Sequence, residues 1–93
     1  MRQRPRKQIQ PKLGPERAIG EAIREIRIKR EISQEELAFE SGFDRTYISL
    51  LERGIRNPTV RTLVKLASVL KVRPSEILLR MEALLKAPKS PKA

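Results

Sequence analysis

The sequence predicts an all-α domain of five helices, and three observations lead to that prediction. Apolar residues recur at intervals of three and four positions in five segments of the 93-residue chain, as they do on the buried face of a helix. Residues that favour helix ends, chiefly Ser, Asp, Thr, Pro and Gly, flank these segments. No segment shows the alternation of apolar and polar residues that is typical of a half-buried β-strand.

The first predicted helix covers residues 15–30 and begins with a proline, which suits the first helical position. Its single apolar stripe consists of Ile19, Ala22, Ile23 and Ile26. A second helix is predicted between Ser33 and Gly42, with Leu37 and Ala38 facing inward. Ser33 and Glu36 have the spacing of a capping box, whose side chains satisfy free amides at the helix start. Gly42 suits the left-handed conformation that often ends a helix.

Three more helices are predicted downstream. Asp44 is expected to cap the third, which runs to Arg53 and ends at Gly54, and a turn follows at 55–58. Its inward residues are Ile48 and Leu51. The fourth helix starts near Thr59 and presents Leu63, Leu66, Ala67 and Leu70. Pro74 opens the fifth, which carries Ile77, Leu78, Met81, Leu84 and Leu85.

Most of the net charge of +10 lies at the two ends of the chain. Residues 1–15 carry five basic residues and no acid, and residues 86–93 carry three more, so that 16–85 has a net charge of only +2. We therefore expect a folded domain over 15–86, between a disordered basic arm at 1–14 and a disordered Lys/Pro tail at 87–93. Such an excess of positive charge points to a polyanion as the partner.

The composition excludes several classes of function. The chain has no Cys and no His, so it offers no disulfide, no Cys/His zinc site and no imidazole base. Glu35 and Glu36 are adjacent, and on a helix they point about 100° apart. We expect no enzyme, no metal and no cofactor. The longest uncharged run is the six residues Thr46–Leu51, against roughly 20 for a bilayer span, so no membrane partner is expected.

Residues 33–54 have the pattern of a helix-turn-helix unit. Ala38 is small enough for the next helix to cross closely, and Gly42 suits a turn with positive φ. Ile48 and Leu51 anchor the third helix, which leaves its opposite face free to enter a groove of DNA. The alternative is that the unit only packs within the protein and does not contact DNA.

Over residues 23–78 the chain resembles the lambda-repressor-like (Cro-type, XRE) helix-turn-helix DNA-binding domains. The matching stretch is IREIRIKREISQEELAFESGFDRTYISLLERGIRNPTVRTLVKLASVLKVRPSEIL. The motifs that carry the resemblance are SQEELA, Gly42, YIS, ERG, NP and LVKLASVLKV. The resemblance implies a compact five-helix domain that binds operator DNA as a two-fold dimer.

The resemblance also implies roles for individual residues. Those expected to contact bases are Arg45, Thr46, Ser49 and Leu50. Those expected to contact phosphates are Ser33, Gln34, Tyr47, Arg53, Arg56 and Asn57. Arg27 and Glu52 occupy the positions of a structural ion pair. Three departures stand out. Glu31 stands where the family often has glycine, so that turn is expected either to differ or to be strained. Leu50 stands where a polar, groove-facing residue is usual, and Arg73 is a poor helix cap.

The fifth helix carries more apolar residues than one stripe of so small a domain buries, which marks a partner surface. The expected homodimer interface consists of Leu78, Leu79, Met81, Leu84 and Leu85. The alternative is that the last turn frays.

The predicted function is a sequence-specific transcriptional regulator, a repressor or controller that binds double-stranded DNA. We expect a homodimer on a palindromic operator, with the third helix in the major groove. The expected location is the cytoplasm, with the nucleoid, and no small-molecule effector is implied. The alternative is a protein-binding adaptor, such as an antitoxin or a coactivator-type bridging domain.

The basic arm at 1–14 has three interpretations. It wraps along DNA or enters a minor groove, it tethers the protein to DNA without sequence preference, or it only makes the chain more soluble.

Overall fold

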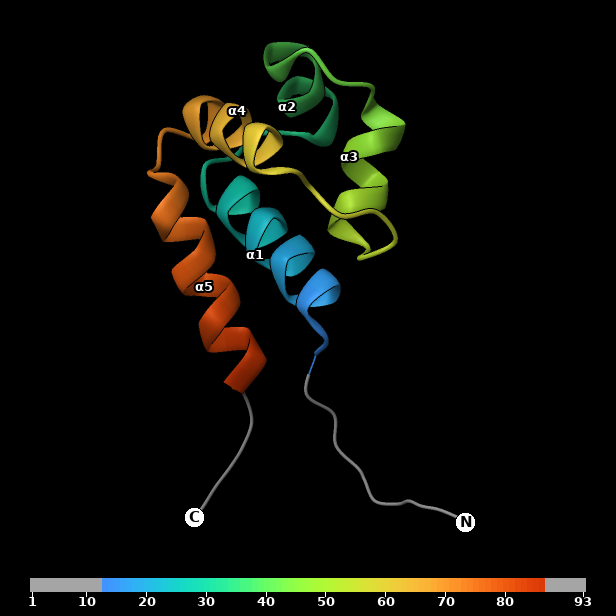
Figure 1. Cartoon of the computed structure of the whole chain (residues 1–93). Coiled ribbons are helices and arrows are strands. Elements are labelled where there is room, and N and C mark those ends of the chain that lie inside the picture. The colour runs from blue at the N-terminus through green and yellow to red at the C-terminus, as the bar shows by residue number, and fades with distance from the viewer. Residues whose placement is uncertain (1–12, 87–93) are drawn as a thin grey trace.

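The computed structural model describes residues 13–86, and this part of the chain forms the five helices that the sequence predicts (Figure 1). They are α1 (Pro15–Lys29), α2 (Gln34–Ser41), α3 (Arg45–Glu52), α4 (Val60–Leu70) and α5 (Pro74–Lys86). The all-α fold is confirmed. The predicted arm and tail fall largely on residues 1–12 and 87–93, which lie outside the described residues.

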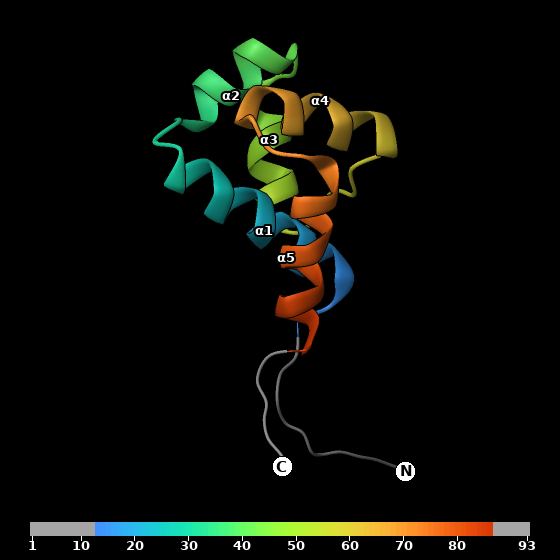
Figure 2. The ribbon, with the colours of Figure 1, turned by 90° about the vertical axis from the view of Figure 1, so that its left-hand side faces the viewer.

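Helix α1 is central to the packing. It contacts α3 on one side and α5 on the other, while α2 packs against α3 and α4. Helix α4 reaches α5 as well. The start of α1 and the end of α5 lie at the same end of the molecule, and α2 and α4 lie at the other (Figures 1 and 2). This arrangement leaves α3 on the outside of the bundle.

All five helices contribute to one apolar core. Its members are Ile19, Ala22, Ile23, Leu37, Ala38, Ile48, Leu51, Leu63, Leu66, Ala67, Leu70 and Ile77. These include the predicted inward residues of the first four helices, except that Ile26 is only partly buried against the others. The 3.6-residue periodicity therefore identified the buried faces of the first four helices correctly.

Local sequence signals mark both ends of α2 and the start of α3. The Ser33 hydroxyl accepts the Glu36 amide at 2.9 Å, and Gly42 has a φ of 80°. Asp44 holds the position before α3, but its side chain makes no capping hydrogen bond. The prediction is right about where α3 begins and wrong about the bond, because the exposed Asp44 carboxylate faces solvent.

Two residues with side chains adopt the left-handed conformation that favours glycine. Glu31 has a φ of 59°, so the turn after α1 is strained, which is one of the two outcomes expected there. Lys71, at the end of α4, has a φ of 61° and carries no sequence signal. Arg73 caps α5 through its backbone, because its carbonyl accepts the Glu76 amide at 2.9 Å, while its own amide donates to the Glu76 carboxylate at 2.7 Å. The carbonyl thus takes the place of the capping side chain that Arg73 lacks.

Helix α1 crosses the end of α3 at Gly20. A Cβ atom added there would lie 2.8 Å from the Glu52 carbonyl oxygen and still closer to that of Leu51. Because real Cβ atoms do not approach carbonyl oxygens so closely, only glycine permits this crossing.

A buried ion pair joins three helices just beyond that crossing. Arg27 of α1 donates from Nε to Glu52 Oε2 at 2.6 Å and from Nη2 to Oε1 at 3.0 Å. The Gln34 side-chain amide of α2 donates to the same Oε1 at 3.0 Å. Arg27 Nη1 donates to the Ile32 carbonyl at 2.8 Å. Glu52 is only 5% exposed, so its charge depends on these donors.

We predict that Gly20→Ala destabilises the fold by about 2 kcal/mol, because the new methyl group would push α1 away from α3. Urea unfolding followed by circular dichroism measures this change. Gly14→Ala is the matched control, since its Cβ would lie 3.7 Å from its nearest neighbour. Equal stability of the two variants would show that the helices separate without cost.

We predict that Arg27→Met costs about 3 kcal/mol, because it leaves the buried Glu52 carboxylate without its cation. Adding Glu52→Gln should recover part of that loss, since the charge that needed a partner is then gone. The control is Arg80→Met. It breaks an Arg80–Glu25 pair of the same 2.6 Å length that is largely exposed, so its cost should stay below about 1 kcal/mol. If the losses of stability from the two single substitutions simply add up in the double variant, Arg27 and Glu52 are not coupled.

Candidate nucleic-acid interface

The outer face of α3 presents three of the four residues expected to contact bases. Arg45 and Thr46 are exposed and Ser49 is half-buried. Together they line a shallow hollow of about 160 Å³ on the surface. The opposite face of α3 is held in the core by Ile48 and Leu51. The helix is therefore fixed by one face and offers donors and acceptors on the other.

Leu50, the fourth expected base contact, lies apart from this hollow. Its side chain is half-buried, and its carbonyl accepts the amides of Ile55 and Arg56 at 2.9 and 3.3 Å. These two bonds turn the chain sharply after α3. Leu50 thus has a role in ending the helix that is independent of any base.

On one flank of α3, the start of α2 holds Ser33 and Gln34. The Ser33 hydroxyl is occupied as an acceptor by the cap, but its own proton stays available. The Gln34 side chain donates to Glu52 and keeps a second amide proton. Both side chains are therefore oriented by the fold, and both retain a donor that a phosphate would accept.

The other flank is the chain that follows α3. Three residues expected to contact phosphates are exposed there: Arg53, Arg56 and Asn57. Tyr47 is half-buried, and its hydroxyl lies 3.5 Å from that of Thr62 at the start of α4. The Arg56 guanidinium lies over the Tyr47 ring, 5.5 Å from its centroid. Two sets of hydrogen-bond donors thus lie next to α3.

Two further residues beside this flank were missed by sequence reasoning. The Phe43 ring packs at 5.1 Å from the Tyr47 ring, and Lys65 Nζ lies 5.4 Å from the centre of Phe43. Neither was assigned a role from the sequence, and they come from different elements. No signal along the chain could have brought them together.

The apolar residues of α5 divide into two groups. Leu78 and Leu79 are exposed, at 42% and 62%. Met81 and Leu84 are partly buried and pack against the domain's own core. Leu85 is half-buried. The surface left for a partner is thus smaller than the sequence suggests, and it centres on Leu78 and Leu79.

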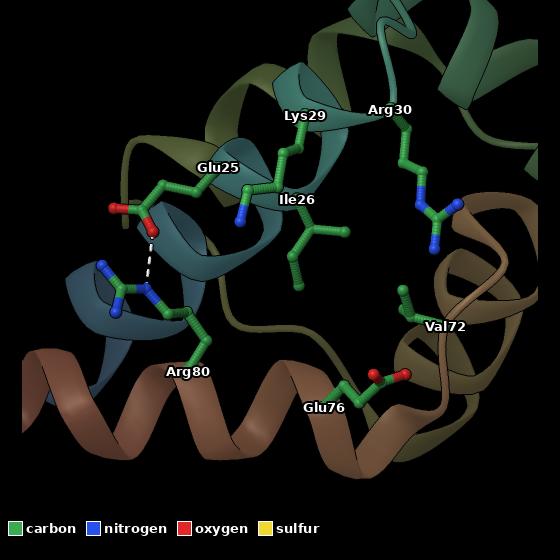
Figure 3. Close-up of a pocket in the computed structure, with 7 residues that line it drawn as sticks. All are labelled: Glu25, Ile26, Lys29, Arg30, Val72, Glu76 and Arg80. Carbon is green, nitrogen blue, oxygen red and sulfur yellow. Dashed lines mark hydrogen bonds and ion pairs between the residues drawn. The ribbon is translucent and has the colours of Figure 1, made fainter.

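A groove of about 460 Å³ between α1 and α5 lies apart from α3 (Figure 3). Its lining residues are Glu25, Ile26, Lys29, Arg30, Val72, Glu76 and Arg80. Arg80 Nε donates to Glu25 at 2.6 Å, and this bond raises the pKa of the Arg80 guanidinium. Arg30 Nη2 donates to the Lys71 carbonyl at 3.1 Å. These bonds join α5 and the α4–α5 connection to α1, so we assign the groove to packing.

Within residues 13–86, no three metal-ligating side chains lie together. No helix in that range is long and apolar enough to cross a bilayer.

Comparison with known proteins places this geometry in a family. The helix-turn-helix family HTH_3 matches residues 23–77. Control protein C.BamHI of Bacillus amyloliquefaciens is 45% identical over 60 residues, which are 63% of this chain and 74% of that protein. The names of such relatives are those of controllers and regulators, in agreement with the prediction that the chain is no enzyme.

Solved structures of controller proteins have the same fold. The restriction-modification controller protein C.AhdI of Aeromonas hydrophila superposes with a TM-score of 0.64 at 43% identity, covering 66% of this chain and 92% of that one. The controller C.Esp1396I in a nucleoprotein complex gives a TM-score of 0.70 at 30% identity, covering 78% and 95%.

The family match covers more than half of the chain. It contains α2, the turn at Gly42 and α3, together with every residue of the two flanks described above. The chain therefore belongs to the HTH_3 family of helix-turn-helix proteins.

Proposed function

We propose that this DNA-binding transcriptional regulator binds a palindromic operator as a homodimer, with α3 of each protomer in the major groove. The observation that carries the proposal is the outer face of α3, where Arg45, Thr46 and Ser49 lie together, with two sets of hydrogen-bond donors next to the helix. A helix held by its inner face and flanked in this way suits a groove lined by phosphates.

Base recognition is assigned to α3. The Arg45 guanidinium has the geometry to donate two hydrogen bonds to guanine O6 and N7. The hydroxyls of Thr46 and Ser49 suit either a donor or an acceptor on a base edge. Leu50 has an apolar side chain, which suits the methyl group of thymine. Arg45 is the residue on which we expect sequence preference to depend most.

Phosphate contacts are assigned to the two flanks. Ser33 and Gln34 lie at the start of α2, where free amides and the helix dipole also favour an anion. On the other flank the expected contacts are Tyr47, Arg53, Arg56 and Asn57. Such contacts fix the register of the protein on DNA but do not choose the sequence.

The relatives support a regulator of the controller type. Control protein C.BamHI and the controller C.AhdI are similar to this chain over most of its helix-turn-helix domain. The controller C.Esp1396I has been solved in a nucleoprotein complex. We therefore favour a repressor or controller, which would act in the cytoplasm, where the nucleoid lies.

The dimer is assigned to α5. Leu78 and Leu79 form its exposed apolar centre, and Met81, Leu84 and Leu85 lie along the same helix. A two-fold dimer would place its two copies of α3 in successive major grooves, about 34 Å apart.

A protein-binding adaptor is the second candidate, because Phe39 on α2 is 83% exposed. Exposed apolar side chains of this size are enriched in protein interfaces. A stoichiometric protein partner after purification, with only weak and salt-sensitive DNA binding, would favour the adaptor over the regulator.

We predict that selection of bound sites from random duplex DNA recovers a palindrome with half-sites one helical turn apart. Arg45→Ala should lose the preference at one base pair in each half-site, because it removes a bidentate base contact. Arg73→Ala is the matched control, since Arg73 is exposed in the α4–α5 connection, across the molecule from α3 (Figure 1). An unchanged consensus for Arg45→Ala would overturn its role, and the absence of any consensus would overturn sequence-specific binding.

We predict that Leu79→Glu converts the dimer to a monomer, because it places a charge at the centre of the apolar surface of α5. The stability of the fold should change by less than about 0.5 kcal/mol, since the side chain is exposed. Sedimentation velocity measures the mass. Phe39→Glu, which puts the same charge on an exposed apolar residue of α2, should remain dimeric. A dimeric Leu79 variant would rule out this interface.

A further inference from the structure

We propose that Phe43 is a positioning residue for DNA binding, which acts through Tyr47 on the guanidinium of Arg56. The inference rests on the phosphate contact that we propose for Arg56. It comes from a row of four side chains in which two aromatic rings lie between two cations. In order, the side chains are those of Lys65, Phe43, Tyr47 and Arg56.

The distances make this set one continuous stack. Lys65 Nζ lies 5.4 Å from the centroid of the Phe43 ring. The rings of Phe43 and Tyr47 lie 5.1 Å apart at an angle of 50°, within the range in which tilted rings attract each other. Arg56 Cζ lies 5.5 Å from the centroid of Tyr47. Both cation–ring distances are within the reach of a cation–π interaction.

Arg56 needs such support because little else orients it. It is exposed in the loop between α3 and α4, and among residues 13–86 its guanidinium has no carboxylate within ion-pair distance. A long side chain of this kind loses rotamer freedom when it binds a phosphate. Contact with the face of Tyr47 removes part of that freedom in advance.

Tyr47 can support Arg56 only if its own ring is fixed. Phe43, in the turn between α2 and α3, packs against the apolar core and against the Tyr47 ring. The Tyr47 hydroxyl makes only a long approach to that of Thr62, at 3.5 Å. Phe43 is therefore the aromatic partner that helps to hold the ring beside Arg56.

Lys65 holds the far end of the stack. Its ammonium lies over the Phe43 ring, which attracts a cation through the negative charge of its face. The stack thus connects α4, the α2–α3 turn, α3 and the α3–α4 loop. A change at Phe43 should reach Arg56 without any contact between Phe43 and DNA.

The test is a double-mutant cycle of Phe43→Leu and Arg56→Ala, with DNA affinity as the readout. The probes are a duplex with the selected consensus and a random-sequence duplex of equal length. Phe43→Leu should weaken both about two- to fivefold, the range of one exposed cation–π contact. Arg56→Ala should weaken both and reduce the salt slope by about one. Combined with Arg56→Ala, Phe43→Leu should change affinity by less than about 1.5-fold.

Two controls separate positioning from simple damage to the fold. Phe39→Leu makes the same replacement at an exposed phenylalanine of α2 and should leave affinity unchanged. Phe43→Tyr keeps the ring and should bind as the unaltered protein does. In the free protein, the NMR order parameter of Arg56 Nε should fall in Phe43→Leu and stay unchanged in Phe43→Tyr. This readout remains decisive even if Phe43→Leu lowers the melting temperature.

The outcomes distinguish the positioning role of Phe43 from the phosphate contact of Arg56. If Arg56→Ala reduces the salt slope but the two substitutions act additively, the positioning role is wrong and the phosphate contact stands. An unchanged order parameter of Arg56 in Phe43→Leu leads to the same conclusion. If Arg56→Ala leaves both affinity and slope unchanged, the phosphate contact is wrong and the inference fails with it.

Discussion

A single buried carboxylate joins α1 to the two helices that carry the interface, α2 and α3. Glu52, at the end of α3, accepts hydrogen bonds from Arg27 of α1 and from Gln34 of α2. A buried charge is costly unless its partners are in place, so this network favours one arrangement of the three helices. The contact of α1 with the end of α3 at Gly20 brings the donors within reach. The direction of α3 is therefore determined from inside the molecule.

This constraint separates residues that set the fold from residues that are free to vary. Nothing in the core depends on Arg45 or Thr46, because α3 is anchored by Ile48, Leu51 and Glu52. Sequence preference can therefore change at low cost to stability. Gln34 is different, since its side chain also holds Glu52. A residue with both functions is expected to tolerate few replacements.

Local signals explain which parts of this structure the sequence predicts. The five helices and their inward faces follow from apolar spacing and from end residues such as Ser33, Gly42 and Pro74, because each signal acts within one or two turns. The same spacing also predicts which face of α3 is exposed, because that face lies opposite the inward residues Ile48 and Leu51. The resemblance to helix-turn-helix domains then indicates which exposed residues matter. What the sequence leaves open depends on how the helices meet: the need for glycine at position 20 arises only where α1 crosses α3. The stack through Phe43 likewise joins elements that no local pattern connects.

Charge is unevenly distributed within residues 16–85, although their net charge is only +2. This distribution would decide which part of the interface faces DNA as it approaches. Helix α2 carries Glu35, Glu36 and Glu40 and no basic residue, whereas 53–61 carries Arg53, Arg56 and Arg61 and no acid. A polyanion is attracted more strongly to the second segment than to α2, where the carboxylates oppose the attraction at the helix start. DNA that approaches from solution would therefore turn the loop after α3 toward itself before any base is touched. The net charge of only +2 also limits the attraction of the folded domain to DNA in other orientations. Individual side chains at the interface, and not the net charge, would therefore decide where the folded domain binds.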